Sequence, residues 1–555
     1  MAKKLTKNHF NLLDGIFLLA PFFYGILPIW SCCLLGLICC IGIIYKYNKE
    51  KRLQFPKGIQ IYLVVLYLIS FIITEFVAID KGMNLLAFIK NISILLFIIL
   101  LAQFEENEEE RNRHLYMISI SSTISVAISL LLILVPVQDI FFNARLQGLF
   151  FYANSYGLFL LVGALVLFLK KERNWYDYLM LAILFIGIVL TNSRAIILMT
   201  LIFSIVTLFF NKEQIRSSII AIICFIITFV GGYFIFNMEK RVSTEMLGSS
   251  EFISRIIYYQ DAAKMITNHP LGLGYEGFWY EQAKEQTAIY DSKFVHSSII
   301  QICLDVGIIP AITLITLVAM TFFSKNQNAF SRIIIFAILL HSLIDFDLEY
   351  LYFILIIALF IDYEKIVISS KKLVFAIFIP IACVMAWIFL GDALYYAKNY
   401  EWATRIIPFH SDALQEMLYS TTSEEKQLEY ANKVITINKN VSGAYEALRN
   451  KALEDNEFEK AIEYEEQRLA LNKYKIKNYL EYASLLSKAI EYYYEKQENE
   501  MIRIYFEKVI QIEDGINETL DLTNPLCYKT IHTPELDIPS NLKNYIENAK
   551  SWLNN

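Results

Sequence analysis

Three ionisable side chains stand near the ends of apolar segments, where they could act together. His296 begins the apolar run HSSIIQICLDVGIIP, Arg194 lies in TNSRAII, and Arg255 lies in the polar stretch that precedes the histidine. An imidazole can take or give a proton near neutral pH. A guanidinium presents a planar fork of donors that matches the oxygens of a phosphate. This set could therefore hold a phosphorylated group and act on a hydroxyl beside it.

Two further groups of residues belong with this set. Arg145, in NARLQGLF, is a third arginine before an apolar run, and for each arginine a lipid headgroup or a carboxylate is the alternative partner. His341 and Asp345, in LLHSLIDFDLEY, are predicted to lie one turn apart on one helix. The acidic residues here could orient a histidine, balance the arginines or bind a cation. Charge balancing and helix capping are favoured, because no ligand spacing indicates a metal site.

The elements that must position these residues are membrane helices. Of the 555 residues, 56% are hydrophobic and 19% are charged, which is typical of a polytopic membrane protein of the all-α class. Since a span needs about 20 apolar residues, we predict about 13 transmembrane helices, with tight hairpins around Trp30 and Asn192. They begin near residues 12, 31, 59, 83, 115, 149, 178, 195, 217, 296, 330, 348 and 373.

Basic residues predict how the chain is oriented. The N-terminus MAKKLTKNHF leads into an apolar run without a small-residue cleavage site, and we interpret it as the cytoplasmic start of the first span. Counting back and forth across the spans puts six charged loops on that same side. These loops are 45–52, 105–113, 170–177, 211–216, 324–332 and 362–372. The same count puts the large loop 238–295 and the end of the chain outside.

The large loop is predicted to hold Arg255 at a fixed depth. Residues 252–267 have helical spacing of apolar side chains, and Pro270, Gly272 and Gly274 then turn the chain. We expect a short helix lying on the membrane surface. The alternative is a solvated amphipathic helix that carries no site.

The last third of the chain has a different character. We predict a membrane domain over 1–391 and an extracytoplasmic helical domain over 392–555. TINKN at 436–440 and ALNKY at 470–474 stand 34 residues apart, and QIEDG at 511–515 could be a third copy. A repeat of helix pairs at this period resembles the tetratricopeptide family, which binds protein partners. An irregular helical domain is the alternative.

Four segments together carry a resemblance to a known family. They are RLQGLFFYANSYG at 145–157, TNSRAIIL at 191–198, SRIIYYQDAAKMITNHPLGLGY at 254–275 and HSSIIQICLDVG at 296–307. In their order and spacing the chain resembles the O-antigen ligase and O-antigen polymerase family, over roughly residues 140–350. The family pattern begins with His296 and Ser297 and continues through Gly307. Its last position is Pro310 here, which departs from the pattern.

The resemblance implies a metal-independent glycosyltransferase of the bacterial cytoplasmic membrane that uses no cofactor. It would move a glycan from an undecaprenyl-diphosphate carrier to an acceptor at the outer face, in cell-surface polysaccharide biosynthesis. Arg194 and Arg255 would hold the diphosphate, and His296 would position or deprotonate the acceptor hydroxyl. The resemblance also implies that Arg145 and Asn154 support the donor site. Ser297, His341 and Asp345 are further candidate substrate-binding residues.

The acceptor is left open by the sequence. A lipid-linked glycan as acceptor would make the protein a polymerase. A cell-envelope lipid or wall polymer would make it a ligase, and a protein side chain would make it a protein O-oligosaccharyltransferase. The helical repeats of the tail slightly favour a protein partner or acceptor. Two alternatives belong to other classes, namely a transporter or flippase for polysaccharide precursors and a plain membrane anchor. Nothing indicates a nucleic-acid partner.

Overall fold

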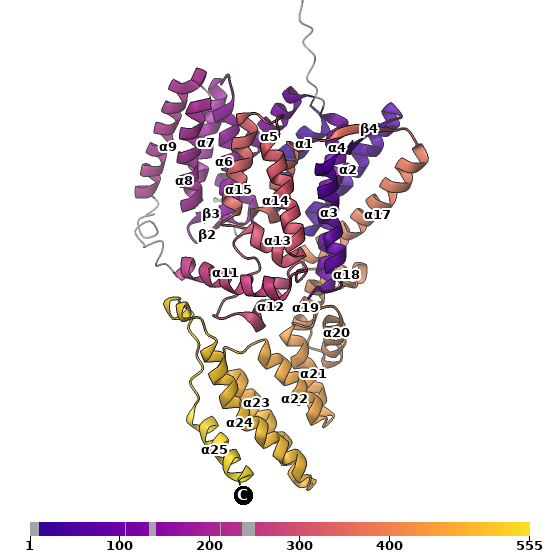
Figure 1. The fold of residues 1–555 in the computed structure, drawn as a ribbon, viewed down its shortest axis with the longest axis vertical. Coiled ribbons are helices and arrows are strands. Elements are labelled where there is room, and N and C mark those ends of the chain that lie inside the picture. Colours follow the sequence, from indigo (N-terminus) through magenta and orange to yellow (C-terminus); the bar gives the residue numbers. More distant parts are fainter. Residues whose placement is uncertain (1–9, 106, 133–139, 211, 236–249, 555) are drawn as a thin grey trace, which may run out of the picture.

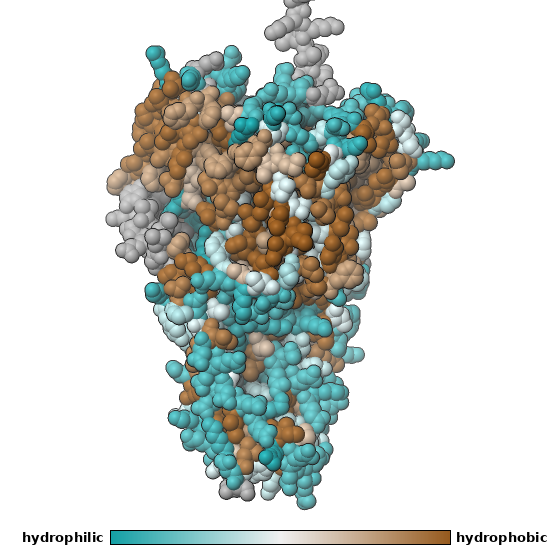
Figure 2. Space-filling view, in the orientation of Figure 1, coloured by the Kyte–Doolittle hydropathy of each residue, from teal (hydrophilic) through white to brown (hydrophobic). Residues whose placement is uncertain are grey.

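The protein is an all-α molecule in two parts, a wide helical bundle and a narrower helical array below it (Figure 1). The computed structural model describes residues 10–554, apart from 106, 133–139, 211 and 236–249. The bundle is apolar on its outer surface, whereas the array is covered mainly by polar residues (Figure 2). This contrast is the one that a lipid-facing part and a water-facing part require.

Every one of the 13 predicted spans contains a helix. The bundle consists of α1 (Leu12–Leu19), α2 (Ile29–Glu50), α3 (Ile59–Thr74), α4 (Lys81–Phe104), α5 (Glu108–Leu132), α6 (Ala153–Leu169), α7 (Trp175–Leu190), α8 (Arg194–Phe210), α9 (Ile215–Ile235), α13 (Ser298–Val306), α14 (Ile308–Phe323), α15 (Ala329–Ser342), α16 (Leu351–Ala358) and α17 (Lys371–Tyr396). Among the described residues, five helices are long and apolar enough to cross a membrane, and seven more are apolar but shorter. The predicted polytopic all-α class is confirmed.

Two predicted spans differ from the expectation. The span that begins near 348 contains only the eight-residue helix α16. The continuous helix expected from His296 to Pro310 is broken into α13 and α14 at Gly307, where φ is +93°. A Cβ at Gly307 would lie 2.6 Å from the carbonyl oxygen of Pro270, and one at Gly272 would lie 2.6 Å from that of Asp305. Two glycines therefore let the loop after α11 pack directly against the end of α13.

The central helices explain how the bundle is held together. Every residue of α6 but Asn154 is buried, because the helix is apolar on all its faces. It packs between α5, α7, α8 and α15, while α2 packs against α4 and α17. Arg145 lies in a two-stranded ribbon before α6, formed by β2 (Phe141–Phe142) and β3 (Arg145–Leu146).

Contacts between loops gather several of the charged loops at one end of the bundle. Strand β1 (Leu53–Lys57) after α2 pairs antiparallel with β4 (Glu364–Ile368) after α16. Lys365 donates to the carbonyl of Glu105, and Asn328 donates to Glu108, which adds the loops after α14 and α4. Four of the six loops predicted for one side thus meet at one end of the bundle, opposite the helical array (Figure 1).

The other end carries the large loop and the array. Helix α11 (Ser250–Asn268) lies crosswise between the bundle and the array, with α12 (Gly277–Glu285) beside it (Figure 1). The predicted helix at 252–267 is thereby confirmed. The array comprises α18 (Tyr400–Ile406), α19 (Ser411–Ser420), α20 (Glu424–Ile437), α21 (Ser442–Glu454), α22 (Phe458–Ala470), α23 (Ile476–Glu495), α24 (Asn499–Asp521) and α25 (Ser540–Leu553).

The array contains one repeated helix pair with the predicted spacing. Helix α22 begins 34 residues after α20, and α23 begins 34 residues after α21. TINKN and ALNKY both span the end of the first helix of a pair. QIEDG, in contrast, lies inside the long helix α24 and ends no helix. The tetratricopeptide resemblance itself stays a prediction.

Candidate functional site

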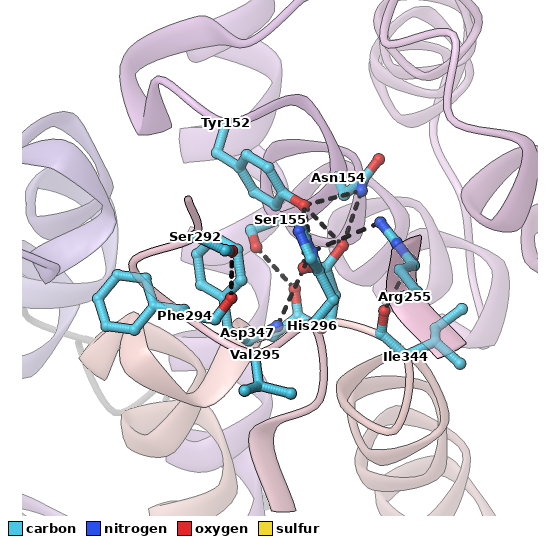
Figure 3. Close-up of polar contacts among 12 residues, drawn as sticks. Tyr152, Asn154, Ser155, Arg255, Ser292, Phe294, Val295, His296, Ile344 and Asp347 are labelled. Atoms are coloured by element: carbon cyan, nitrogen blue, oxygen red, sulfur yellow. Dashed lines mark hydrogen bonds and ion pairs between the residues drawn. The ribbon is translucent and has the colours of Figure 1, made fainter. Parts of the chain in front are cut away.

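The site lies where four segments meet at the array end of the bundle. Tyr152 and Asn154 stand at the start of α6, Arg255 projects from α11, His296 precedes α13, and Asp345 follows α15. Figure 3 shows these elements bringing Tyr152, Asn154, Arg255 and His296 together, and Asp345 is joined to them by the hydrogen bonds described below. The local reason is that Tyr152, Asn154, His296 and Asp345 sit at or near the ends of bundle helices, where the chain leaves the bundle, while α11 lies across that end.

A buried carboxylate holds the histidine. His296 Nδ1 lies 3.2 Å from Asp345 Oδ1, and the carboxylate also accepts hydrogen bonds from the Tyr152 hydroxyl at 2.9 Å and from Asn154 Nδ2 at 2.7 Å. Asp345 is 1% exposed, whereas the His296 side chain is 21% exposed. The imidazole is thus fixed on its Nδ1 side and remains partly open.

Helix α11 supplies two contacts to the same histidine. Arg255 Nη2 lies 3.5 Å from His296 Nδ1, and Nη1 donates to the carbonyl of Ile344 at 3.1 Å. One turn further on, the Tyr259 hydroxyl donates to the backbone carbonyl of His296. Because Arg255 and Tyr259 share a helix face, α11 positions the histidine and its neighbouring positive charge as one unit.

The charges of this cluster keep Asp345 ionised. Asp345 lies in the turn after α15, outside the spanning helices, and its burial alone would raise its pKa. The hydrogen bond and charge of His296, with the positive charge of Arg255, outweigh burial and hold the pKa of Asp345 well below its usual range. An ionised Asp345 favours the imidazole form that donates from Nδ1. Nε2 then carries the lone pair and can accept a proton.

Arg145 links Asn154 to the turn that precedes Arg194. Arg145 Nε donates to the carbonyl of Thr191 at 3.0 Å, and its Nη2 donates to Asn154 Oδ1. Thr191 stands three residues before Arg194, at the turn between α7 and α8 that the sequence predicts. The half-buried side chain of Arg194 makes no hydrogen bond or ion pair within the described ranges.

One of the predicted pairings is wrong. Helix α15 ends at Ser342, so His341 and Asp345 are not one turn apart on one helix. His341 Nδ1 instead lies 2.6 Å from Asp347, which also accepts a hydrogen bond from Ser155, and all three side chains are buried. Ser297 is the N-cap residue of α13 without a capping hydrogen bond. Its neighbour Ser298 makes the local contacts.

Three residues of the cluster were missed by sequence reasoning. Ser298 donates from both its amide and its hydroxyl to the carbonyl of Asp345, at 2.9 Å each. Tyr152 and Tyr259 contact the carboxylate and the histidine, as described above. Both tyrosines lie inside the segments that carry the family resemblance. A search of those segments for polar aromatic residues would have found them.

An apolar groove adjoins the site. It has a volume of about 310 Å³ and lies between α13, α14 and α15. Ile299, three residues after His296, and Leu343, two residues before Asp345, belong to its wall. The groove faces the apolar belt of the bundle, so a hydrocarbon chain there would place its polar end near the histidine.

Fold and site together define the class of the protein. It is a polytopic all-α membrane protein with a histidine, a carboxylate and arginines gathered at one end of its bundle. Residues 179–315 match the family model described as O-antigen ligase. This part of the chain is therefore similar to the O-antigen ligase family, and no curated protein matches the chain. The matched range includes Arg194, Arg255 and His296, and it ends before Asp345.

Proposed function

We propose that this bacterial membrane protein transfers a glycan from an undecaprenyl-diphosphate carrier to an acceptor hydroxyl at the outer face of the cytoplasmic membrane. The observation that carries the proposal is the partly open histidine held by a buried carboxylate beside an arginine. His296 Nδ1 lies 3.2 Å from Asp345 Oδ1 and 3.5 Å from Arg255 Nη2. The family match supports glycosyl transfer as the reaction class.

The histidine acts as the general base. As the acceptor oxygen bonds to the anomeric carbon, the bond from that carbon to the diphosphate oxygen breaks. The hydroxyl proton moves to Nε2 of His296, and the electron pair leaves with the diphosphate. Asp345 keeps Nδ1 as the donor and stabilises the imidazolium that forms.

The arginines act on the leaving group. Arg255 and Arg194 bind the diphosphate and stabilise the negative charge that grows on it as the glycosidic bond breaks. Arg145 supports the donor site through Asn154 and the turn before α8. The apolar groove between α14 and α15 accommodates the first isoprene units of the carrier. This arrangement needs geometry and charge more than covalent chemistry, because the leaving group is already activated.

A decisive experiment uses the purified chain in liposomes with a lipid-linked glycan and an acceptor. The His296→Ala variant is expected to lose transfer by a factor of about 100 or more, the typical contribution of a general base. His269→Ala is the matched control, since His269 lies at the end of α11 at the same end of the bundle but outside the cluster. Wild-type transfer by folded His296→Ala protein would overturn the proposal.

The identity of the acceptor distinguishes three forms of the proposed reaction. A polymerase adds to a lipid-linked glycan, a ligase to an envelope lipid, and a protein O-oligosaccharyltransferase to a serine or threonine. Offering the three acceptors in the same assay, and identifying the product by mass, assigns one of them. The donor site is shared by all three.

A transporter of polysaccharide precursors is the second candidate. The break between α13 and α14 and a buried pair of charges in the bundle are features that transporters share. Lys90 Nζ lies 3.3 Å from Glu349 and faces a cavity of about 60 Å³, which has room for a few water molecules and none for a sugar. Loss of precursor flipping with unchanged transfer in Lys90→Met would favour the transporter.

A further inference from the structure

We propose that the cleft between α12 and the array is a saccharide-binding site, which presents the glycan to the reaction proposed above and in that sense rests on it. The cleft has a volume of about 570 Å³, larger than the apolar groove beside the histidine. It is lined on one side by α12 and the loop after it, and on the other by the array. Its lining includes Trp279, Gln282, Gln286, Tyr290, Asn472 and Glu535.

The lining has the chemistry of a surface for neutral, polar ligands. Indole and phenol rings offer apolar faces for the C–H face of a sugar ring, while amides and carboxylates pair with its hydroxyl groups. Charges of both signs border the cleft, with Lys475 and Glu535 in the array and Asp291 in the loop. One lysine against two carboxylates favours an uncharged ligand over a phosphate.

One lining residue has an unused acceptor. Gln286 Oε1 is buried and has no hydrogen-bond partner among the residues that the structure describes, although its backbone carbonyl accepts from the Tyr474 hydroxyl at 3.3 Å. A buried amide oxygen without a donor is costly. A rotation of the half-buried Gln286 side chain toward the cleft would let a sugar hydroxyl supply that donor.

The aromatic face of the cleft is held in place before any ligand binds. Trp279 Nε1 donates to Asp291 at 2.8 Å, and Gln282 Nε2 donates to the carbonyl of Trp279 at 2.8 Å. Lys293 Nζ lies 5.1 Å from the centre of the indole ring. A ring that is already fixed loses little conformational freedom on binding, which favours affinity.

Aromatic contacts connect the cleft to the histidine. The Tyr290 ring in the cleft wall lies 4.5 Å from the Tyr258 ring, and the Tyr258 ring lies 6.3 Å from His296, measured between ring centres. The Tyr290 hydroxyl is fixed on Asp261 at 2.8 Å. A saccharide that extends from the cleft along these rings would bring its end to the imidazole.

The array completes the cleft and does not merely lie near it. Lys473 Nζ donates to the carbonyl of Lys284 at 2.6 Å, and Asn524 N donates to that of Thr287 at 2.8 Å. Lys284 Nζ in turn donates to Asn440 at 2.6 Å. These contacts fix the two walls relative to each other, so the proposal gives the helical tail a role in holding substrate.

The test measures binding of labelled oligosaccharides to the full-length protein in detergent, by fluorescence polarisation. One probe is the oligosaccharide released by mild acid from the lipid carriers of the producing cell, and the other is a fragment of its surface polysaccharide. Trp279→Ala is expected to raise the Kd of at least one probe about tenfold or more, as loss of a central aromatic anchor does. Trp175→Ala, on exposed Trp175 at the opposite end of the bundle, is expected to leave it unchanged.

A second variant controls for the possibility that Trp279→Ala misfolds. Gln286→Ala removes a side-chain oxygen that has no partner in the described structure, so it should fold normally and still weaken binding. Unchanged Kd in both cleft variants, or no binding of either probe to the wild type, would overturn the proposal. The probe that depends on Trp279 identifies the bound glycan as donor or acceptor.

The outcomes also separate this proposal from the proposed reaction. His296→Ala should bind oligosaccharide normally while losing transfer. If transfer survives in His296→Ala but binding still depends on Trp279, the reaction is wrong and the cleft stands. If transfer depends on His296 while both cleft variants bind normally, the proposed reaction stands and the saccharide-binding cleft is wrong.

Discussion

Two histidine–aspartate pairs lie within the same corner of the molecule and differ in one respect. His341 is 1% exposed and lies 2.6 Å from an equally buried Asp347, whereas His296 is 21% exposed and lies 3.2 Å from Asp345. The closed pair joins α15 to the turn before α16, and Ser155 of α6 is its third member. Identical residue types therefore serve as scaffold when sealed and as a candidate site when one ring edge stays open.

The largest expected effect concerns the positive charge beside the open pair. Arg255→Ala should lower transfer by a factor of about 100 to 1000, because the leaving diphosphate loses a charged donor. Arg255→Lys should retain only part of the wild-type transfer rate, since an ammonium group lacks the planar fork of donors. Steady-state transfer in liposomes measures both. Arg405→Ala is the control, because Arg405 forms an exposed ion pair with Glu401 in the array. An equal loss of transfer in that variant would mean that the effect of Arg255→Ala is not specific to the site.

The closed pair should affect stability instead. His341→Ala leaves Asp347 buried with only Ser155 as its side-chain partner, and loss of one member of a buried pair costs about 3 kcal/mol. Thermal unfolding in detergent should show a clearly lower midpoint, and transfer per folded molecule should stay near the wild-type value. A His341→Ala protein with normal stability and no transfer would show that the closed pair takes part in chemistry.

A smaller effect is expected when one hydrogen bond to Asp345 of the open pair is removed. Tyr152→Phe removes the hydroxyl that donates to both oxygens of Asp345 at 2.9 Å, while Asn154 and the histidine remain. Transfer is expected to fall by less than about tenfold, because one hydrogen bond to the carboxylate is lost while those of Asn154 and His296 remain. The pH dependence of kcat should shift with it. A loss as large as that of Arg255→Ala would mean that Tyr152 itself contacts the substrate.

The smallest effect belongs to a carboxyl group far from both pairs. Glu276, in the loop before α12, is buried beside Lys293 and Asp412, and burial, with the charge of Asp412, raises its pKa to about 8. The folded protein therefore holds a proton that the unfolded chain releases near pH 4.5, so stability should decrease as pH rises from about 4.5 to about 8.

Glu276→Gln should flatten that dependence, since the amide keeps the shape of the neutral acid. Unfolding midpoints of the wild type and the variant, followed from pH 4.5 to 8, test this directly. Parallel curves would mean that Glu276 is ionised in the folded protein throughout this range.

The helices could be predicted from the sequence, whereas the contacts at their ends could not. Apolar runs identify a helix at each predicted span, and the spacing of apolar side chains identifies α11. The break at Gly307 escapes such reasoning, because apolar residues continue across it. Its cause is the backbone of Pro270, which approaches from a loop more than thirty residues earlier.

The same limit applies to the site. His296, Arg255 and Arg145 can be selected from residue type and from the family resemblance. The partner of His296 depends on where α15 ends, and a helix predicted to continue past Ser342 pairs Asp345 with the wrong histidine. A three-residue difference in a helix end thus decides which carboxylate serves which imidazole.

The most direct test of the account is the single-turnover rate of His296→Ala with lipid-linked donor already bound. Such a measurement separates the chemical step from donor binding. The account predicts donor affinity within about twofold of the wild type and a chemical step slower by a factor of about 100 or more. A folded variant that completes the turnover at the wild-type rate would contradict the central claim.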